Sequence, residues 1–290
     1  MSVAPVGIAP VPSLAAHARR LFARHGTIRV LVGSNLKAGH RDKVLGHLWS
    51  LLDPLMFMLV YYFVFGFLFK LGGDGGGGRS TAFMLYILVG VLTYRFIDGT
   101  ISQSALCIRS NRGLIHEINF PKSVFPVSIA LSRLYDLLWG IVALMIFLLV
   151  AGIWPTIHYL WLPLLIAVSF TLAVGAAFVV AYLGAFYADT VNVVNVAMRL
   201  MFYCSPIFYF VREPPGAPGA PVLLEGHDTI RLLYMLNPIA CLLECYRDAM
   251  LWGVAPEARL LWYVTWISAA LCIAGFALFS RGEGKFAKYV

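Results

Sequence analysis

Charged side chains are scarce in this sequence. Only 12% of its 290 residues are Asp, Glu, Lys or Arg, whereas 60% are hydrophobic. Soluble domains contain about 25% charged and about 45–50% apolar residues. A water-soluble chain of this length would have no interior large enough for the apolar excess, so the solvent that fits it is lipid. The composition predicts an integral membrane protein.

Cysteine is also sparse, and no residue set typical of a metal site or an enzyme centre is visible. The five cysteines show no zinc-like pairing, so we expect neither a metal site nor a disulfide: Cys107, Cys204, Cys241, Cys245 and Cys272. No clustered carboxylates stand at a membrane boundary, as a membrane-embedded enzyme would need. We therefore expect no catalytic residue in this chain.

A nucleotide-binding loop is missing as well. Gly73 to Ser80 resembles a degenerate phosphate-binding loop, but Arg79 stands where Lys is needed and no strand precedes it. We expect no cofactor in this chain. The net charge of +8 does not indicate nucleic-acid binding, because the basic residues lie between apolar runs rather than on one polar domain.

Long apolar windows dominate what is present. A transmembrane helix needs about 20 mainly apolar residues. Six windows meet this requirement: Trp49–Leu71, Thr81–Ile108, Val124–Trp154, Tyr159–Tyr187, Val191–Val211 and Leu260–Phe279. The predicted fold class is therefore an all-α integral membrane protein with six transmembrane helices.

Residues 230–252 are apolar but unsuited to a lipid-facing span. They include Arg231, Glu244, Arg247 and Asp248 and are interrupted by Asn237-Pro238. Broken backbone at membrane depth is tolerated only inside protein or beside water. We expect short re-entrant or interfacial helices before the last span.

Basic residues are concentrated before the first window, between the second and third, and in the tail, which predicts cytoplasmic N- and C-termini. Residues 1–20 are expected to form a flexible cytoplasmic arm without a cleaved signal peptide. In residues 21–43, apolar side chains recur at near-helical spacing among basic ones: Leu21, Ile28, Leu31, Val32 and Leu36. This pattern favours an amphipathic interface helix over a plain basic arm.

Several charges fall inside the windows. Arg95 and Asp98 are three residues apart, as are Arg133 and Asp136, so each pair shares one helix face. A charge near a helix centre costs about 2.5–3.5 kcal/mol on insertion scales. The pairs either form a polar path or proton relay, or they lock helices together as buried ion pairs, or their side chains extend toward a membrane interface. Asp53 and Arg199 pose the same alternative.

Aromatic residues are dense in the first and fifth windows. Two sets stand out: Phe57, Tyr61 and Phe65 at four-residue spacing, and Phe202, Tyr203, Phe208, Tyr209 and Phe210 around Ser205-Pro206. Such residues form an interfacial belt or pack against lipid. Alternatively, some line a conduit for a sugar chain, because flat rings offer an apolar face without tight binding.

Four segments in this order resemble one known family. They begin at His40 (HRDKVLGHLWSLLDPL), Asn111 (NRGLIHEINFPK), Tyr203 (YCSPIFY) and Asn237 (NPIACLLECYR). The chain from about Leu21 onward is similar to type-2 ABC exporter permeases of bacterial cell-surface polysaccharides. That group comprises the O-antigen (Wzm), teichoic-acid and capsule exporters.

The resemblance implies a homodimeric permease domain over residues 21–290, in the bacterial cytoplasmic (inner) membrane. Two copies of a separate cytoplasmic ABC ATPase would bind ATP and Mg²⁺.

The resemblance also implies three sets of functional residues. Residues 109–122 would couple to the ATPase through Arg112, Leu114, His116 and Glu117. Residues 230–252 would gate the outer mouth with Asn237, Pro238, Glu244 and Arg247. The channel would be lined by Phe57, Tyr61, Phe65, Tyr203 and Tyr209.

The function that follows is ATP-driven export of a lipid-linked, O-antigen-like polysaccharide. One alternative is a type-2 permease for a small amphiphile such as a drug or a lipid. Another is an ion-coupled secondary transporter that uses the Arg–Asp pairs as a relay. Against the latter, the sequence shows no internal repeat.

Overall fold

The computed structural model describes residues 19, 21, 23–40, 52, 56, 59, 60, 63, 64, 77–117, 120–212 and 234–289. For residues 38–40, 77–81, 116–117 and 287–289 it describes the backbone alone. The element order is α2 (His25–His40), α4 (Gly77–Ser104), α5 (Cys107–Ser110), α6 (Arg112–Glu117), α7 (Val124–Val150), η2 (Ile157–Trp161), α8 (Leu162–Phe186), α9 (Thr190–Tyr203), α11 (Pro238–Arg247), η3 (Asp248–Trp252) and α12 (Ala258–Tyr289).

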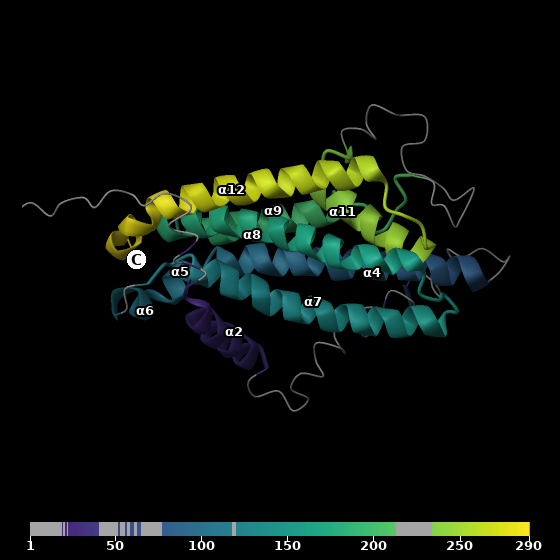
Figure 1. Cartoon of the computed structure of the whole chain (residues 1–290), viewed down its shortest axis with the longest axis horizontal. Coiled ribbons are helices and arrows are strands. Elements are labelled where there is room, and N and C mark those ends of the chain that lie inside the picture. Colours follow the sequence, from purple (N-terminus) through teal and green to yellow (C-terminus); the bar gives the residue numbers. More distant parts are fainter. Residues whose placement is uncertain are drawn as a thin grey trace, which may run out of the picture.

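The long helices of the described part of the chain form a bundle, and they lie roughly side by side in Figure 1. Within the described part of the chain, the helical stretches long and apolar enough to cross a membrane are Ala82–Ser104, Val124–Val150, Ile157–Phe186 and Ala258–Phe286. They correspond to the second, third, fourth and sixth apolar windows, which are confirmed as long apolar helices. Helix α8 packs against α4 on one side and α12 on the other, so it forms the centre of the bundle.

The helix ends follow from local sequence. Helix α7 ends where Gly152 adopts a φ of 79°, a left-handed conformation that glycine reaches without a Cβ penalty. The Gly152 N–H donates to the Leu149 carbonyl at 3.0 Å, and the Ile153 N–H donates to the Leu148 carbonyl at 2.8 Å. This is a Schellman motif, which satisfies the last carbonyls of a helix.

Helices α8 and α12 approach each other backbone to backbone. A Cβ placed on Gly175 of α8 would lie 2.6 Å from the Cys272 backbone nitrogen of α12, and one on Gly275 would overlap the Gly175 carbonyl oxygen. Small residues allow such contacts, and close packing is the main source of helix association in lipid. The two helices therefore form one closely packed pair.

The fifth window differs from a single long helix. Helix α9 covers Thr190–Tyr203, only 14 residues, and the chain beyond it is non-helical as far as Arg212. Pro206 accounts for the break, because proline removes a helix donor and disfavours helical backbone at the preceding residue. Most of the first window lies outside the described residues, and the count of six spans stays a prediction.

The predicted amphipathic segment contains helix α2, which packs against α7. Its apolar residues Ile28 and Leu31 contact a buried cluster that also contains Leu21, while Arg24 and Arg29 are exposed. The helix thus turns its apolar side to α7 rather than lying apart from the bundle.

The bundle has two distinct ends. At one end lie α5, α6 and the C-terminal turns of α12, which we call the α6 end; at the opposite end lie α11, η3 and the start of α12, which we call the α11 end (Figure 1). The residue sets expected to couple to a partner and to gate the pathway therefore occupy opposite ends of the molecule.

Candidate functional site

Helix α11 begins at the Asn237-Pro238 step. The Asn237 side-chain oxygen accepts a hydrogen bond from the Ile239 N–H at 3.0 Å, and Pro238 occupies the first helical turn, where its missing N–H costs nothing. The Asn237 amide also donates to the Ser205 hydroxyl at 3.1 Å. Two of the motifs that the sequence places 32 residues apart therefore meet directly at the start of α11.

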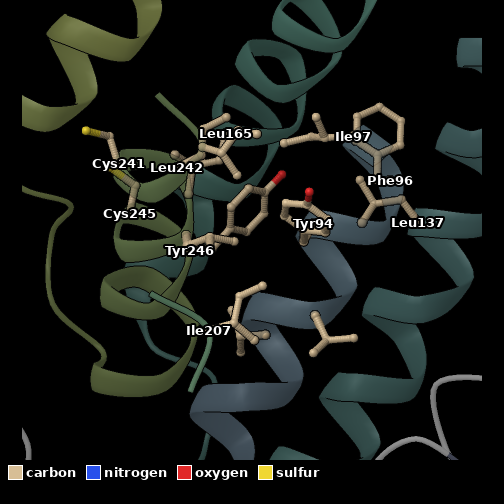
Figure 2. Packing of buried hydrophobic residues seen from close by; sticks show 14 of the residues in the cluster. Tyr94, Phe96, Ile97, Leu137, Leu165, Ile207, Cys241, Leu242, Cys245 and Tyr246 are labelled. Carbon is tan, nitrogen blue, oxygen red and sulfur yellow. The ribbon is translucent and has the colours of Figure 1, made fainter. Parts of the chain in front are cut away.

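Helix α11 is buried along almost its whole length. Figure 2 shows Leu242 and Tyr246 of α11 packed toward Leu165 of α8 and Tyr94 of α4. The Tyr246 hydroxyl lies 3.2 Å from the hydroxyl of Ser169 in α8. After η3, Gly253 adopts a φ of 60° and the chain turns into α12. A short buried helix followed by a reversal fits the expected re-entrant segment, although its relation to a membrane face stays a prediction.

A polar cluster fixes α11 to α4. Arg247 is fully buried, and its Nη1 donates to Glu244 Oε1 at 2.7 Å while its Nε donates to the Tyr86 carbonyl oxygen at 3.2 Å. The guanidinium carbon stands 3.3 Å from the centroid of the Tyr86 ring, a cation–π contact. The Tyr86 hydroxyl donates in turn to Glu244 Oε1 at 3.1 Å.

Arg212 extends this cluster toward the chain that follows α9. Its Nε donates to Glu244 Oε2 at 2.9 Å, its Nη2 pairs with Asp248 Oδ1, and its Nη1 lies 3.4 Å from Glu257 Oε2. Glu257 is exposed, whereas Glu244 and Asp248 are buried. We refer to Tyr86, Arg212, Glu244, Arg247 and Asp248 as the Arg247 cluster.

The electrostatics of the Arg247 cluster show how buried carboxylates are tolerated. Burial alone would raise the pKa of Glu244, but the neighbouring Arg247 and Arg212 guanidinium groups hold the pKa below its usual value. Burial raises the pKa of Asp248, and Arg212 opposes that rise only in part. Two arginines thus compensate carboxylates that could not stay charged alone in an apolar interior.

A glycine makes room for the buried arginine. A Cβ on Gly90 of α4 would lie only 2.6 Å from Arg247 Nη2. That Nη2 group is itself buried and has no hydrogen-bond partner within the described residues. The Arg247 guanidinium therefore contacts Tyr86 and Glu244, and it also packs against the Gly90 backbone, where no side chain intervenes.

Sequence reasoning placed Glu244 and Arg247 in the gating segment but missed Tyr86 and Arg212, which complete their environment. The available signal was the i, i+3 spacing of Glu244 and Arg247 in an apolar segment, since buried charges require further partners. Arg212 stands just after the fifth window, where it counted only as a loop charge.

At the α6 end, the predicted coupling residues divide between exposed and buried positions. Arg112 and Leu114 of α6 are exposed, whereas Ile115 is buried against α8 and α12 residues. The backbones of His116 and Glu117 belong to α6, but their side chains lie outside the described residues. Helix α6 thus presents one face outward and buries the other.

Of the predicted intramembrane charges, Arg133 and Asp136 form an ion pair at 3.2 Å on α7, with each side chain about one third exposed. In α4, Asp98 accepts a hydrogen bond from the Ser102 hydroxyl at 2.9 Å, and Arg95 is exposed. Asp53 lies outside the described residues. The role of these charges stays a prediction.

The predicted channel-lining aromatics are partly described. Tyr203 is exposed at the end of α9, and the Tyr209 hydroxyl donates to the Tyr203 carbonyl oxygen at 2.9 Å. The ring of Tyr209 also stands 5.9 Å from that of Tyr234, and their hydroxyls meet. Phe57, Tyr61 and Phe65 lie outside the described residues.

The described residues contain no group of three or more His, Cys, Asp or Glu side chains arranged to hold a metal ion. The two ends differ in burial: the described side chains of α6 are mostly exposed, whereas α11 is buried and ion-paired.

Comparisons with known proteins agree with this architecture. The family model described as ABC-2 type transporter matches residues 27–251. The chain is 23% identical over 272 residues to the O-antigen export system permease protein RfbA of Myxococcus xanthus, covering 94% of this chain and 98% of that protein. It is 25% identical over 261 residues to the RfbA protein of the same description from Klebsiella pneumoniae, covering 89% and 93%.

A further relative is the polysialic acid transport protein KpsM of Escherichia coli, which is 21% identical over 244 residues and covers 82% of this chain and 86% of its own length. The family match spans well over half of the sequence, including α2, the α6 region and α11. The chain therefore belongs to the ABC-2 type transporter family.

Proposed function

We propose that this chain is the transmembrane permease subunit of an ATP-driven exporter that moves a lipid-linked polysaccharide across the bacterial cytoplasmic membrane. The observation that carries the proposal is the near full-length similarity to permeases of O-antigen export. The similarity to a polysialic acid transport protein also supports a polysaccharide as the substrate class. Both termini are expected to lie in the cytoplasm.

The α6 end is the proposed docking site for a separate cytoplasmic ATPase, which would bind ATP and Mg²⁺. Arg112 and Leu114 offer a cation and an apolar side chain on the outward face of α6, while Ile115 anchors the opposite face. Because α6 is packed against the bundle on one face, a displacement of α6 by a bound ATPase would be transmitted to the bundle. His116 and Glu117 would contribute to the same contact.

A second copy of the chain is proposed to complete the translocation path. Helix α9 buries only Thr190, Val194 and Met198, a single narrow stripe. Its remaining surface exposes large apolar side chains, namely Val193, Val196, Leu200, Met201 and Tyr203. We propose that part of this surface faces the partner copy, and that Tyr203 and Tyr209 would then lie beside the path for the glycan.

The α11 end is the proposed outer gate. Helix α11 is tied to α4 by Arg247 and to the chain after α9 by Arg212, so a shift of either neighbour acts on the same short helix. ATP-driven closure of the partner can open this end only if the two conformations of the permease bind the nucleotide-loaded partner with different affinity. Processive export then favours weak, repeated aromatic contacts over one tight site.

The proposal is tested by co-expressing the chain with a candidate ABC ATPase from the same organism and purifying the complex in detergent. We expect the two proteins to co-purify and the ATPase rate to rise on addition of the lipid-linked glycan. Stimulation by a small amphiphile but not by the glycan would favour a drug or lipid permease. Export that follows a proton gradient without ATP would overturn the proposal.

A further inference from the structure

Two contacts to the ends of other helices flank α6 in the sequence, and the first is made by Arg109 of α5, just before α6 begins. Its Nε donates to the carbonyl oxygen of Gly184 at 2.8 Å, in the last turn of α8. Carbonyls in the last turn lack partners within their own helix, and a cation there is favoured by the helix dipole. Gly184 also lies directly against the Ala105 backbone, because an added Cβ would overlap the Ala105 carbonyl oxygen.

The second attachment follows α6 and involves Glu283 of α12. Its carboxylate Oε1 accepts a hydrogen bond from the backbone N–H of Lys122, just before α7 begins. Helix α7 has no acidic residue in its first turn, and its N-cap residue Ser123 makes no side-chain capping bond. A carboxylate from 161 residues further along the chain therefore supplies the negative charge that a helix N-terminus favours.

Apolar packing reinforces the attachment to α12. Ile115 and Phe120, on either side of the end of α6, belong to the same buried cluster as Phe279 and Phe286 of α12. The rings of Phe279 and Phe286 stand 5.1 Å apart. The chain at and just after α6 is thus connected to α12 by a part-buried hydrogen bond to a carboxylate and by apolar packing in one shared cluster.

The two helices that receive these contacts are the closely packed pair α8 and α12. At Gly175 and Gly275 the two helices touch through backbone atoms, so no side chains lie between them there that would allow the helices to slide. A displacement of α6 therefore acts on α8 through Arg109 and on α12 through Glu283 at once.

We propose that Arg109 and Glu283 are positioning residues that couple movement of α6 to the α8–α12 pair. The inference rests on the proposed function, because α6 is displaced only if a partner pushes on it. It goes beyond that function in assigning the transmitted movement to α8 and α12, rather than to α4 and α7, the long helices that precede and follow α5 and α6 in the sequence. The last turns of α12, which carry Glu283, then receive the movement of α6.

The test uses the full complex of permease and ATPase in membrane vesicles and measures glycan exported per ATP hydrolysed. Glu283→Ala is expected to lower this ratio about tenfold while the partner stays bound, because a hydrogen bond to a charged group shifts an equilibrium by about that factor or more. Glu283→Gln keeps an acceptor oxygen and should restore most of the ratio. Gly284→Ala is the matched control, since its Cβ meets nothing within 4 Å.

Arg109→Gln provides an independent variant in case Glu283→Ala does not insert into the membrane, and it should lower the ratio in the same way. A normal export-to-ATP ratio in Glu283→Ala or Arg109→Gln would overturn the inference and leave the proposed function intact. Parallel loss of ATPase activity and export, without rescue by Glu283→Gln, would also overturn it, because that is the pattern of simple misfolding. A wild-type chain that binds no ATPase would overturn both the proposed function and this inference.

Discussion

Arg247 of α11 and Tyr86 of α4 are joined twice: Arg247 Nε donates to the Tyr86 carbonyl oxygen at 3.2 Å, and the guanidinium carbon lies 3.3 Å from the centroid of the Tyr86 ring. This contact holds a buried arginine between two helices that are far apart in the sequence. The same arginine pairs with Glu244, whose other oxygen accepts from Arg212. Helix α11 is therefore attached through electrostatics as well as through apolar packing.

Replacing the buried arginine should be strongly destabilising. Arg247→Met leaves Glu244 buried with one of its two guanidinium partners removed, and breaking a buried pair costs about 3–5 kcal/mol. We expect a large fall in thermal stability in detergent, measured by loss of the monodisperse protein after heating. Arg259→Met changes an exposed arginine of α12 and should leave the melting temperature unchanged. Equal melting curves for both variants would show that the pair contributes little.

Gly90 should matter because of Arg247. In Gly90→Ala the new Cβ would stand 2.6 Å from Arg247 Nη2, and the guanidinium cannot move away without loosening its bonds to Glu244 and Tyr86. Overpacking of this kind costs about 1–3 kcal/mol. The penalty should shrink in an Arg247→Met background, since neighbouring residues are not additive. An unchanged penalty in that background would assign it to some other contact.

The α8–α12 contact should resist even one added methyl group. In Gly175→Ala the Cβ meets the Cys272 backbone nitrogen at 2.6 Å, and backbone cannot rotate aside as a side chain can. We expect a loss of about 1–3 kcal/mol, measured as a lower melting temperature of the detergent-solubilised protein. A control on the same helix pair is Gly284→Ala, which should be neutral or slightly stabilising. Wild-type stability of Gly175→Ala would mean that the helices are not in backbone contact.

Reversing the charge at the end of α6 should uncouple export from ATP hydrolysis by the proposed ATPase partner. Glu117→Arg lies in the segment proposed to contact the ATPase, and a like-charge contact across an interface costs several kcal/mol. Export should fall while the protein still inserts into the membrane, as judged by its abundance in the membrane fraction. Export at the wild-type rate would argue against a coupling role for Glu117.

The long helices could be predicted because lipid permits few alternatives. Windows such as Tyr159–Tyr187, which contain no charge, have to become apolar helices once water is excluded, and α8 covers most of that stretch. The short length of α9 was harder to predict from the sequence. The apolar composition continues past Tyr203, but Pro206 breaks the helix.

The contacts that organise the two ends could not be predicted from local pattern. Arg212 and Glu283 read as ordinary loop and tail charges, since their partners lie 32 and 161 residues away in the sequence. Tyr86 was one aromatic residue among many in an apolar span. Their roles depend on tertiary packing, which brings α4, α11 and α12 together and which no spacing rule encodes.

The most direct test of the account is transport in proteoliposomes that contain this chain and its ATPase partner. The account predicts that a lipid-linked polysaccharide crosses the membrane when ATP is supplied, and that movement stops when the partner's ATP-binding lysine is replaced. Hydrolysis of ATP by this chain alone, or glycan movement at the full rate with the inactive partner, would contradict it.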